Sequence, residues 1–282
     1  MTVLDSLGTR SARRRATITA VTAALVGATA LGAGPASAIT DGELDGNGHP
    51  AVVLVLMEVD GEPAFRCSGT LIEPSLVLTA GHCTGEPGEF SGMRVFAEPD
   101  VQSDPTYPGP GGPNTVEAKA WHTFPGFTEA QFFLHDVGVI QLAKPIKLPA
   151  GSYGTLPRAN QLDTLKPRAS TTFTSVGFGL QRVNNNPNNV QLLSNRVRMV
   201  AHPQLVQINT GFTGPQSLVL SNNANTGGTC FGDSGGPNFL GTGLVVAGVT
   251  SFGLNGSCGG TGGVFRVDRP DVLSFIAKYR SS

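Results

Sequence analysis

The sequence predicts a mostly β protein that ends in one amphipathic helix. Glycine and proline are abundant, with 38 and 20 copies among 282 residues, and they recur along the chain without a fixed period. This pattern is typical of many short strands joined by turns, and it excludes a collagen-like chain. Apolar runs of strand length lie between the turn residues, whereas a helical spacing of apolar side chains stands out near the C-terminus.

Each predicted strand is a short apolar or alternating run bounded by turn residues. These strands lie, in order, at residues 51–57, 71–72, 76–78, 137–142, 171–176, 218–220 and 244–249. Residues 104–114 and 184–189, which are rich in proline, glycine or asparagine, are expected to form surface loops. Residues 144–168 could connect two halves of the chain. The helix is expected to start at Pro270 and to bury Val272, Phe275, Ile276 and Tyr279.

The composition limits the classes of function. Charged residues make up only 14% of the chain, and the formal net charge is -1. A binder of nucleic acid that works through a basic field is therefore excluded, as is an acidic disordered tail. Apolar residues make up 39%, and the chain is long enough to bury a large core as two domains or as one large β unit.

The first 38 residues predict an export signal. Four arginines between residues 10 and 15 precede an apolar run at 16–33, and Ala36-Ser37-Ala38 follows as a small-residue cleavage pattern. This order is typical of a bacterial-style secretory signal peptide. A membrane anchor is the alternative, but glycines interrupt the run, which is barely as long as the ~20 apolar residues that span a membrane. We expect residues 1–38 to be removed and the exported protein to be free of the membrane.

Three segments carry residue types that fit nucleophilic catalysis. His82 stands between the end of a strand and Cys83, Asp136 precedes an apolar strand, and Ser234 lies in the glycine-rich bend of residues 230–237. A serine hydroxyl is a poor nucleophile at neutral pH, so it needs a base within hydrogen-bond reach, and the base needs an acid that orients it. These residues are therefore candidates for base, acid and nucleophile.

Structural roles are the alternative for each of these residues. His82 could be a core histidine, Asp136 an acid at a strand start, and Ser234 part of a structural turn. A metal site made of His82, His135 and Asp136 is conceivable from residue type alone. We expect no metal, because no histidine pair has the spacing of metal ligands.

The segments TAGHC (79–83) and GDSGGP (232–237), with Asp136 between them, resemble the trypsin/chymotrypsin family of serine proteases. The resemblance runs from about Ile39 to Arg280. It implies an all-β fold of two packed antiparallel Greek-key β-barrels with a short C-terminal helix. The protease domain would cover residues 39–282, with the first barrel at about 39–150 and the second at about 151–282. With its signal peptide, the chain resembles a secreted bacterial member of this family.

The same resemblance assigns roles around the catalytic residues. The backbone N–H groups of Gly232 and Ser234 would form the oxyanion hole. Four cysteines alone leave three pairings open, and the resemblance implies the disulfides Cys67–Cys83 and Cys230–Cys258.

The resemblance also outlines a substrate site. It places the floor of the specificity pocket at Gly228, next to Thr229, and its walls at Gly253 and Gly263. The backbone of Ser251 and Gly253 would pair with an extended substrate, beside the aromatic ring of Phe252. Because these residues carry no charge, we expect a large apolar or aromatic side chain, rather than Arg or Lys, before the cleaved bond.

An activation step is implied at the new N-terminus. Ile39-Thr40-Asp41-Gly42 resembles the start of mature family members, in which the terminal amine pairs with the acid beside the nucleophile, here Asp233. We expect signal cleavage itself to expose this amine. The alternative is that Ile39 merely begins a loose terminus.

The sequence thus predicts a secreted serine endopeptidase that needs no cofactor. Its partners would be polypeptide substrates and protein protease inhibitors, and we expect a monomer that binds neither nucleic acid nor membrane. The alternative is a secreted protein of the same fold that is catalytically silent or acts only on esters.

Overall fold

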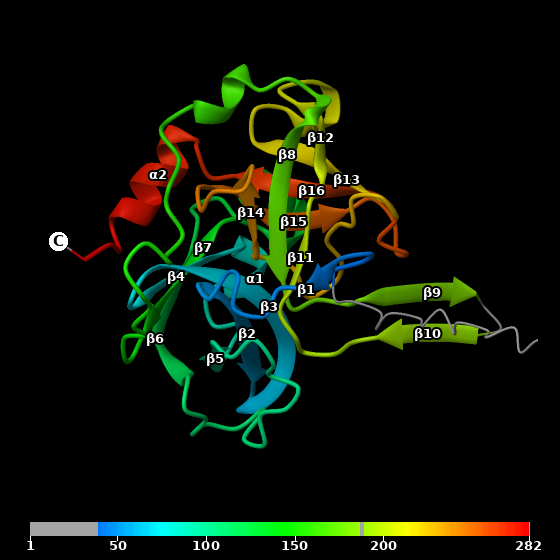
Figure 1. Ribbon diagram of the computed structural model, residues 1–282. Coiled ribbons are helices and arrows are strands. Elements are labelled where there is room, and N and C mark those ends of the chain that lie inside the picture. The colour runs from blue at the N-terminus through cyan, green and yellow to red at the C-terminus, as the bar shows by residue number, and fades with distance from the viewer. Residues whose placement is uncertain (1–38, 187–188, 282) are drawn as a thin grey trace, which may run out of the picture. The chain divides into compact units, whose positions relative to one another are not determined.

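Strands dominate the computed structural model, which describes residues 39–186 and 189–281 (Figure 1). The predicted signal segment at 1–38 lies outside the described residues. Six antiparallel strands close into a first barrel in the order β2-β3-β4-β7-β6-β5. They are β2 (Val52–Val59), β3 (Glu62–Glu73), β4 (Leu76–Thr79), β5 (Gly92–Phe96), β6 (Thr115–Thr123) and β7 (Gly138–Leu142).

The apolar runs of the sequence form the inner strands of this barrel. Residues 52–57 of β2 are all buried, which explains why this strand is apolar along its whole length instead of alternating. β3 and β4 flank the predicted turn at Pro74, and Val77 pairs with Ile140 of β7. The end of β4 and the start of β7 therefore lie side by side, which brings the segments after Thr79 and before Gly138 together.

A second ring of six antiparallel strands closes in the order β8-β12-β13-β16-β15-β14, because β14 also pairs with β8. Its strands are β8 (Arg168–Gly177), β12 (Gln204–Ile208), β13 (Ser217–Asn222), β14 (Pro237–Leu240), β15 (Val246–Gly253) and β16 (Gly260–Arg266). The predicted fold class of two antiparallel barrels and a short C-terminal helix is confirmed. The serine-bearing turn lies between β13 and β14.

Two short strands extend the second sheet and change one predicted boundary. β1 (Glu43–Leu44) pairs with β11 (Met199–Ala201), and β11 pairs with β8. Residues 43 and 44 thus belong to the sheet of the second barrel, although the sequence boundary assigned them to the first. The backbone hydrogen bonds to β11, which no local pattern reveals, decide this placement.

A hairpin occupies part of a predicted loop. β9 (Arg182–Asn186) pairs with β10 (Asn189–Leu193), so the asparagine-rich segment at 184–189 contributes residues to both strands. Residues 187 and 188 lie outside the described residues. The sequence prediction of a plain loop was wrong here, because asparagine disfavours strands only weakly when a partner strand is available.

The helices are short. α1 (Gly81–Thr84) follows β4, and α2 (Pro270–Ala277) is the predicted C-terminal helix, with Pro270 in its first turn. Val272, Phe275 and Ile276 of α2 are buried. The rings of Phe275 and Phe124 pack in an edge-to-face arrangement, with their centroids 5.4 Å apart. Three short 3₁₀ helices span Glu129–Leu134, Gln161–Thr164 and Gly211–Thr213. None of the helices in the described part of the chain is long and apolar enough to cross a membrane.

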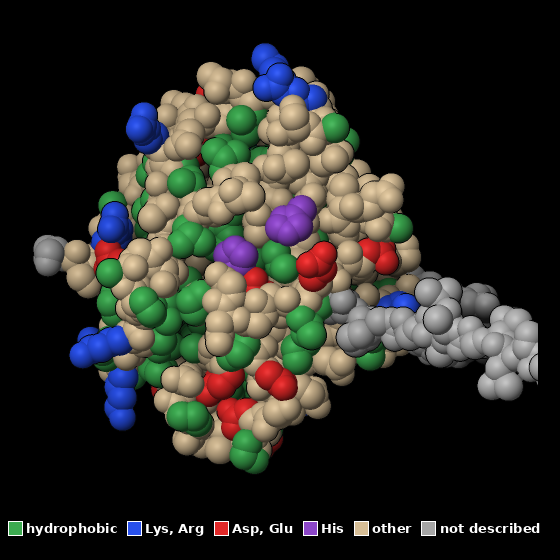
Figure 2. Space-filling model, in the orientation of Figure 1, with side chains coloured by type: hydrophobic (Ala, Val, Ile, Leu, Met, Phe, Trp, Pro, Cys, Tyr) green, Lys and Arg blue, Asp and Glu red, His purple; other side chains and the backbone are tan. Residues whose placement is uncertain are grey.

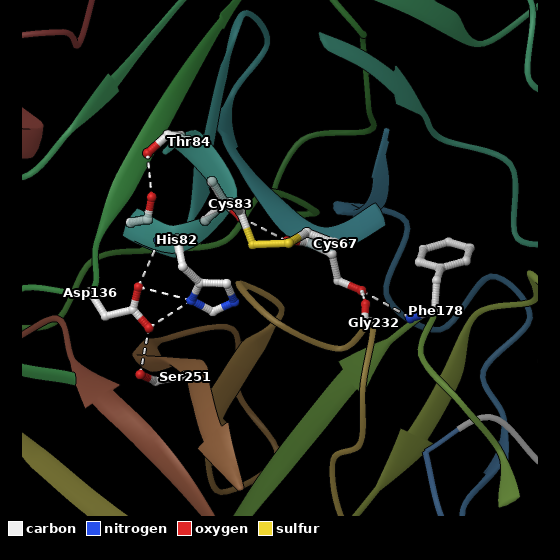
Figure 3. Close-up of a disulfide and its surroundings, with 11 residues drawn as sticks. Cys67, His82, Cys83, Thr84, Asp136, Phe178, Gly232 and Ser251 are labelled. Atoms are coloured by element: carbon white, nitrogen blue, oxygen red, sulfur yellow. Dashed lines mark hydrogen bonds and ion pairs between the residues drawn. A yellow bond between two sulfur atoms is a disulfide. The ribbon is translucent and has the colours of Figure 1, made fainter. Parts of the chain in front are cut away.

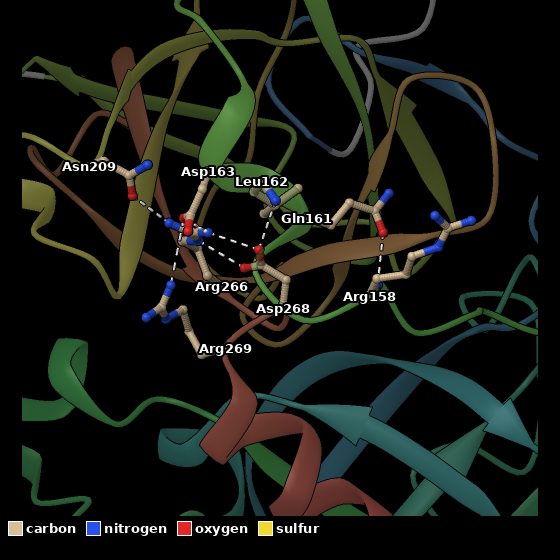
Figure 4. A network of polar contacts seen from close by, with 8 residues as sticks. All are labelled: Arg158, Gln161, Leu162, Asp163, Asn209, Arg266, Asp268 and Arg269. Carbon is tan, nitrogen blue, oxygen red and sulfur yellow. Dashed lines mark hydrogen bonds and ion pairs between the residues drawn. The ribbon is translucent and has the colours of Figure 1, made fainter.

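A buried ionic network joins β16 to the start of α2 (Figure 4). The Arg266 guanidinium donates to both oxygens of Asp268, at 2.9 and 2.8 Å, and to Asp163 at 2.7 Å. Asp268 also accepts the Leu162 N–H at 2.8 Å. Arg266 and Asp268 are fully buried. The positive charge of Arg266 is therefore compensated by Asp268 and Asp163, at the point where the chain leaves the second barrel.

Candidate active site

The paired ends of β4 and β7 place His82 against Asp136 (Figure 3). His82 lies in α1, and Asp136 lies two residues before β7. The Nδ1 atom of His82 is 3.0 Å from both carboxylate oxygens of Asp136, and the His82 backbone N–H donates to the same carboxylate at 2.9 Å. Asp136 is fully buried, whereas 28% of the His82 side chain is exposed. The buried carboxylate of Asp136 thus orients the imidazole ring, and part of the ring stays exposed.

A third residue holds the carboxylate from the second barrel. The hydroxyl of Ser251, in β15, donates to Asp136 Oδ2. Sequence reasoning assigned Ser251 only to the substrate backbone and missed this bond, because nothing near Ser251 in the sequence points to Asp136. The bond couples the two barrels at the buried carboxylate of Asp136.

The electrostatics of His82 follow from these contacts. Burial alone would lower the pKa of the imidazole, but the charge of Asp136 and its hydrogen bond outweigh burial, and Glu89 adds a smaller attraction. The net result is a pKa above the ordinary value of 6.5. Asp136 therefore stabilises the cationic form that a general base passes through.

The turn that carries Ser234 requires glycine at two positions. Gly232 has φ +95° and Gly235 has φ +75°, a region that disfavours residues with a side chain. A Cβ atom on Gly235 would also collide with the side chain of Thr79, and one on Gly232 would lie 3.0 Å from Gly179 Cα. These glycines are therefore required by close packing of the turn against the first barrel at Thr79 and against the segment after β8 at Gly179.

Hydrogen bonding leaves two N–H groups of this turn without a partner. The N–H groups of Asp233, Gly235 and Gly236 donate to the carbonyl groups of Cys230, Thr250 and Asp233, at 3.0, 2.8 and 2.8 Å. Within the described part of the chain, the N–H groups of Gly232 and Ser234 donate to no protein acceptor. Two free donors that flank one residue form an arrangement able to bind an oxyanion.

Both expected disulfides are present. Cys67–Cys83 joins β3 to the helix of His82, and Cys230–Cys258 ties the serine turn to the segment before β16. The first bond closes a sequence separation of 16, which corresponds to about 3 kcal/mol of unfolded-state entropy. Cys67, Cys83 and His82 offer atoms within 4.8 Å of one another. The two sulfur atoms are bonded to each other, however, and are not the thiolates that bind zinc.

A small cavity opens beside Ser234. Its volume is about 90 Å³, and it is lined by Thr229, Cys230, Phe231, Ser234, Ser251, Phe252, Gly253, Asn255, Cys258 and Thr261. Of the predicted substrate-site residues, Thr229, Ser251, Phe252 and Gly253 line it. Gly228 and Gly263 do not. A cavity that holds benzene measures roughly 150 Å³, so the open slot for an aromatic side chain that the sequence predicted is not seen.

The register of β15 against β16 explains this difference. Gly253 pairs with Gly262, one position before the glycine that the sequence assigned. A Cβ atom on Gly262 would lie 2.9 Å from Thr229 Oγ1, whereas one on Gly263 would collide with the ring of Phe252. Gly263 therefore lies under Phe252 and not in the wall of the cavity.

The predicted floor residue is covered as well. The side chain of Asn222 packs so closely on Gly228 that a Cβ atom there would collide with it. Asn222 is buried, donates to the Thr229 carbonyl at 2.8 Å and accepts from Thr40 Oγ1 at 2.7 Å. Sequence reasoning missed Asn222, which comes close to Gly228 because the chain folds back between them, with Asn223 bridging to Gly227.

Asp233 and Ile39, the predicted activation pair, are both fully buried. Asp233 accepts the N–H groups of Gly179 and Cys230, each at 2.8 Å. Burial raises its pKa to about 7, although these donors and the charge of Arg66 oppose the shift. Among the described residues, Asp233 has no ion-pair partner. Ile39 packs with Met199 and Ala201, and the next residue, Thr40, bridges to Gly228.

Comparison with known proteins agrees with this geometry. A family model described as Trypsin matches residues 44–274. Human kallikrein-12 is 28% identical over 229 residues, which cover 77% of this chain and 78% of that protein. Brachyurin from Leptuca pugilator is 29% identical over 201 residues, with 69% and 78% covered. These relatives come from animals, so the expectation of a bacterial member is not borne out by them.

Solved structures show the same fold. HL collagenase has a TM-score of 0.64 at 20% identity and covers 85% of this chain and 97% of its own. Human heparin binding protein has a TM-score of 0.62 at 22% identity, with 86% and 98% covered. At these identities the likeness concerns the fold alone. The family match, which spans most of the sequence, carries the assignment: the chain belongs to the trypsin family of serine proteases.

Proposed function

We propose that this protein is a secreted serine endopeptidase in which Ser234 is the nucleophile, His82 the general base and Asp136 the residue that orients His82. The observation that carries the proposal is a buried Asp136 bound to His82, combined with a tight glycine turn at Ser234. In this turn the N–H groups of Gly232 and Ser234 donate to no acceptor among the described residues. These are the parts that acyl transfer requires.

In this mechanism His82 takes the proton of the Ser234 hydroxyl as the oxygen attacks a peptide carbonyl. The imidazolium that forms is stabilised by Asp136. The N–H groups of Gly232 and Ser234 receive the negative charge of the tetrahedral intermediate, a contribution of about 3 kcal/mol for each donor. His82 then protonates the leaving amine, and a water molecule repeats the sequence on the acyl-enzyme to release the second product.

The walls of the cavity support a preference for uncharged residues before the cleaved bond. The lining contains no acidic or basic side chain, so Arg and Lys are not expected there. With a volume of about 90 Å³, the cavity favours small or medium apolar side chains over aromatic ones. Cleavage of a mixed peptide library tests this. A dominant preference for Arg or Lys would overturn it, and Thr229→Gly should shift cleavage toward larger residues.

Secretion and activation are part of the proposal. Removal of residues 1–38 would free the amine of Ile39, which would pair with Asp233 and replace the missing counter-charge. The burial of both residues and the Thr40–Gly228 bridge support this. We propose residues 39–282 as the protease domain, divided near residue 150. The mature protein would act as an extracellular monomer on polypeptides and be open to protein inhibitors.

The surface charge is consistent with the absence of nucleic acid among the proposed partners. On the face that Figure 2 shows, Lys and Arg side chains lie in small groups near the margins and form no broad basic patch.

The test of the proposed function is Ser234→Ala. This change should abolish cleavage of casein and of peptide esters and should abolish labelling by an organophosphorus serine probe. Ser175→Ala is a matched control, since Ser175 is a fully buried serine in β8 that donates to Asn238. If Ser234→Ala kept more than a small fraction of the activity, the nucleophile would be wrongly assigned. A wild-type protein that neither cleaves nor reacts would instead favour a silent binding protein.

A further inference from the structure

Ser68 occupies a buried position between the two barrels, directly after Cys67 in β3. It is fully buried, and each of its polar atoms is hydrogen-bonded. Its N–H donates to the Ser234 carbonyl at 2.8 Å, and its carbonyl accepts from Thr79 Oγ1 at 2.8 Å. Its hydroxyl donates to the Gly232 carbonyl at 2.9 Å and accepts the Phe178 N–H at 3.0 Å. Figure 3 shows Gly232 and the backbone of Phe178 close to each other near Cys67, the residue before Ser68.

Ser68 binds the carbonyl groups of Gly232 and Ser234, the residues on either side of Asp233. The Gly232 carbonyl belongs to the peptide unit that links Gly232 to Asp233, which lies between the two proposed oxyanion donors. The other carbonyl groups of the turn are held by backbone donors: Leu180 holds that of Phe231, and Gly236 holds that of Asp233, both at 2.8 Å. Among the described residues, the Ser68 hydroxyl is the side-chain group that holds a carbonyl of this turn.

The same hydroxyl connects the turn to the segment that anchors Asp233. Phe178, which donates to Ser68, precedes Gly179, which donates to the Asp233 carboxylate at 2.8 Å. A Cβ atom on Gly177 would lie 3.1 Å from the Ser68 hydroxyl, so this segment packs closely against it. The Ser68 hydroxyl therefore contacts both the turn that carries Asp233 and the segment whose Gly179 N–H binds the Asp233 carboxylate.

We propose that Ser68 is a positioning residue for the oxyanion hole. Its hydroxyl holds the Gly232–Asp233 peptide unit so that the N–H groups of Gly232 and Ser234 point to the same place. Ser68 is buried and acts through the turn, not on the substrate. This inference rests on the proposed function, since an oxyanion forms only if Ser234 attacks a carbonyl.

The test is Ser68→Ala, which removes the hydroxyl and leaves the two backbone hydrogen bonds of residue 68 in place. We expect kcat to fall about tenfold with little change in KM, a smaller loss than the 10²–10³-fold that follows removal of an oxyanion donor itself. The inhibition constant of a peptide aldehyde, whose adduct carries the oxyanion, should rise by the same factor. Ser175→Ala controls for the general loss of a buried hydroxyl and should leave both quantities unchanged.

A second measurement keeps the inference separate from the proposed function. Amide hydrogen exchange in residues 231–236 should be faster in Ser68→Ala than in the wild type and in Ser175→Ala, whether or not the protein is an enzyme. Unchanged exchange in this segment, or a rise in KM with kcat unaltered, would overturn the role of Ser68. A wild-type protein that does not react with the organophosphorus probe would overturn the proposed function instead, while the exchange result would still decide whether Ser68 holds the turn.

Discussion

Two aspartates near the catalytic turn, Asp136 and Asp233, are both fully buried, but their partners differ in kind. Asp136 binds a titratable ring, that of His82, and receives a further hydrogen bond from the Ser251 hydroxyl. Asp233 receives hydrogen bonds from the backbone N–H groups of Gly179 and Cys230 and has only the more distant charge of Arg66 as a counter-charge.

This difference shows what a buried carboxylate needs. Burial penalises the charged form, and neutral donors offset only part of that penalty. The pKa of Asp233 accordingly rises to about 7, whereas Asp136 lies beside a ring that becomes a cation during the proposed turnover. Asp136 in the first barrel thus lies beside a group that can carry a positive charge, whereas Asp233 in the second barrel forms no ion pair with a described residue.

The largest expected effect comes from removing the negative charge of Asp136. Asp136→Asn should lower kcat/KM about 10⁴-fold, because the amide no longer stabilises the imidazolium or selects its tautomer. The pH profile should change too. In the wild type, activity should rise with pH through a pKa above 6.5, whereas in the variant only the weaker attraction of Glu89 opposes burial, and this pKa should fall.

These two readouts are measured together as kcat/KM from pH 5 to 9. Because the folded pKa of His82 is raised, the stabilisation from its cation is full below 6.5 and is lost as pH rises through the folded pKa. Equal pKa values in the two proteins would contradict the role of Asp136.

A smaller effect is expected from leaving Asp233 without the amine of Ile39. In a chain that keeps even one residue before Ile39, Asp233 lacks the amine, and its raised pKa favours the protonated folded state. The free energy of unfolding should therefore fall as pH rises from about 4 to about 7, by roughly 4 kcal/mol at most for a shift from 3.8 to about 7. A chain that begins at Ile39 should not show this fall.

Denaturant unfolding of the two chains across this pH range is the measurement, with Asp233→Asn in the extended chain as the control that removes the slope. The extended chain should also be less active than the chain that begins at Ile39. N-terminal sequencing of the secreted protein identifies the natural start. A mature terminus elsewhere, or matching pH curves for both chains, would rule out the Ile39–Asp233 pair.

The smallest effect is expected from the bond between the barrels. Ser251→Ala removes one donor from Asp136 and leaves His82 in place, so kcat/KM should fall about tenfold, in line with the lower end, about 1.5 kcal/mol, of the range for a hydrogen bond to a charged group. The comparison of kcat/KM with that of Ser175→Ala isolates this contribution. A loss as large as that of Asp136→Asn would mean that Ser251 does more than support the carboxylate.

Much of the site could be predicted because short segments carry it. His82, Asp136 and Ser234 each stand in a local pattern, and so do the cysteines that fix the segments around His82 and Ser234. The strand runs at 51–57 and 137–142 were also predictable, since burial on both faces requires a continuous apolar run. The helix at Pro270 was predictable because burial of one face imposes a helical period.

The sequence by itself determined a mostly β chain with a C-terminal helix and the residues able to do the chemistry, and its motifs, through the family resemblance, implied the two barrels and an uncharged pocket. Only the tertiary structure decided that Gly262 faces Gly253 and that Ser251 and Ser68 reach the acid and the turn. The physical reason is the same in each case. A shift of one residue in strand register moves a side chain to the other face, and contacts between strands far apart in the chain leave no period in the sequence.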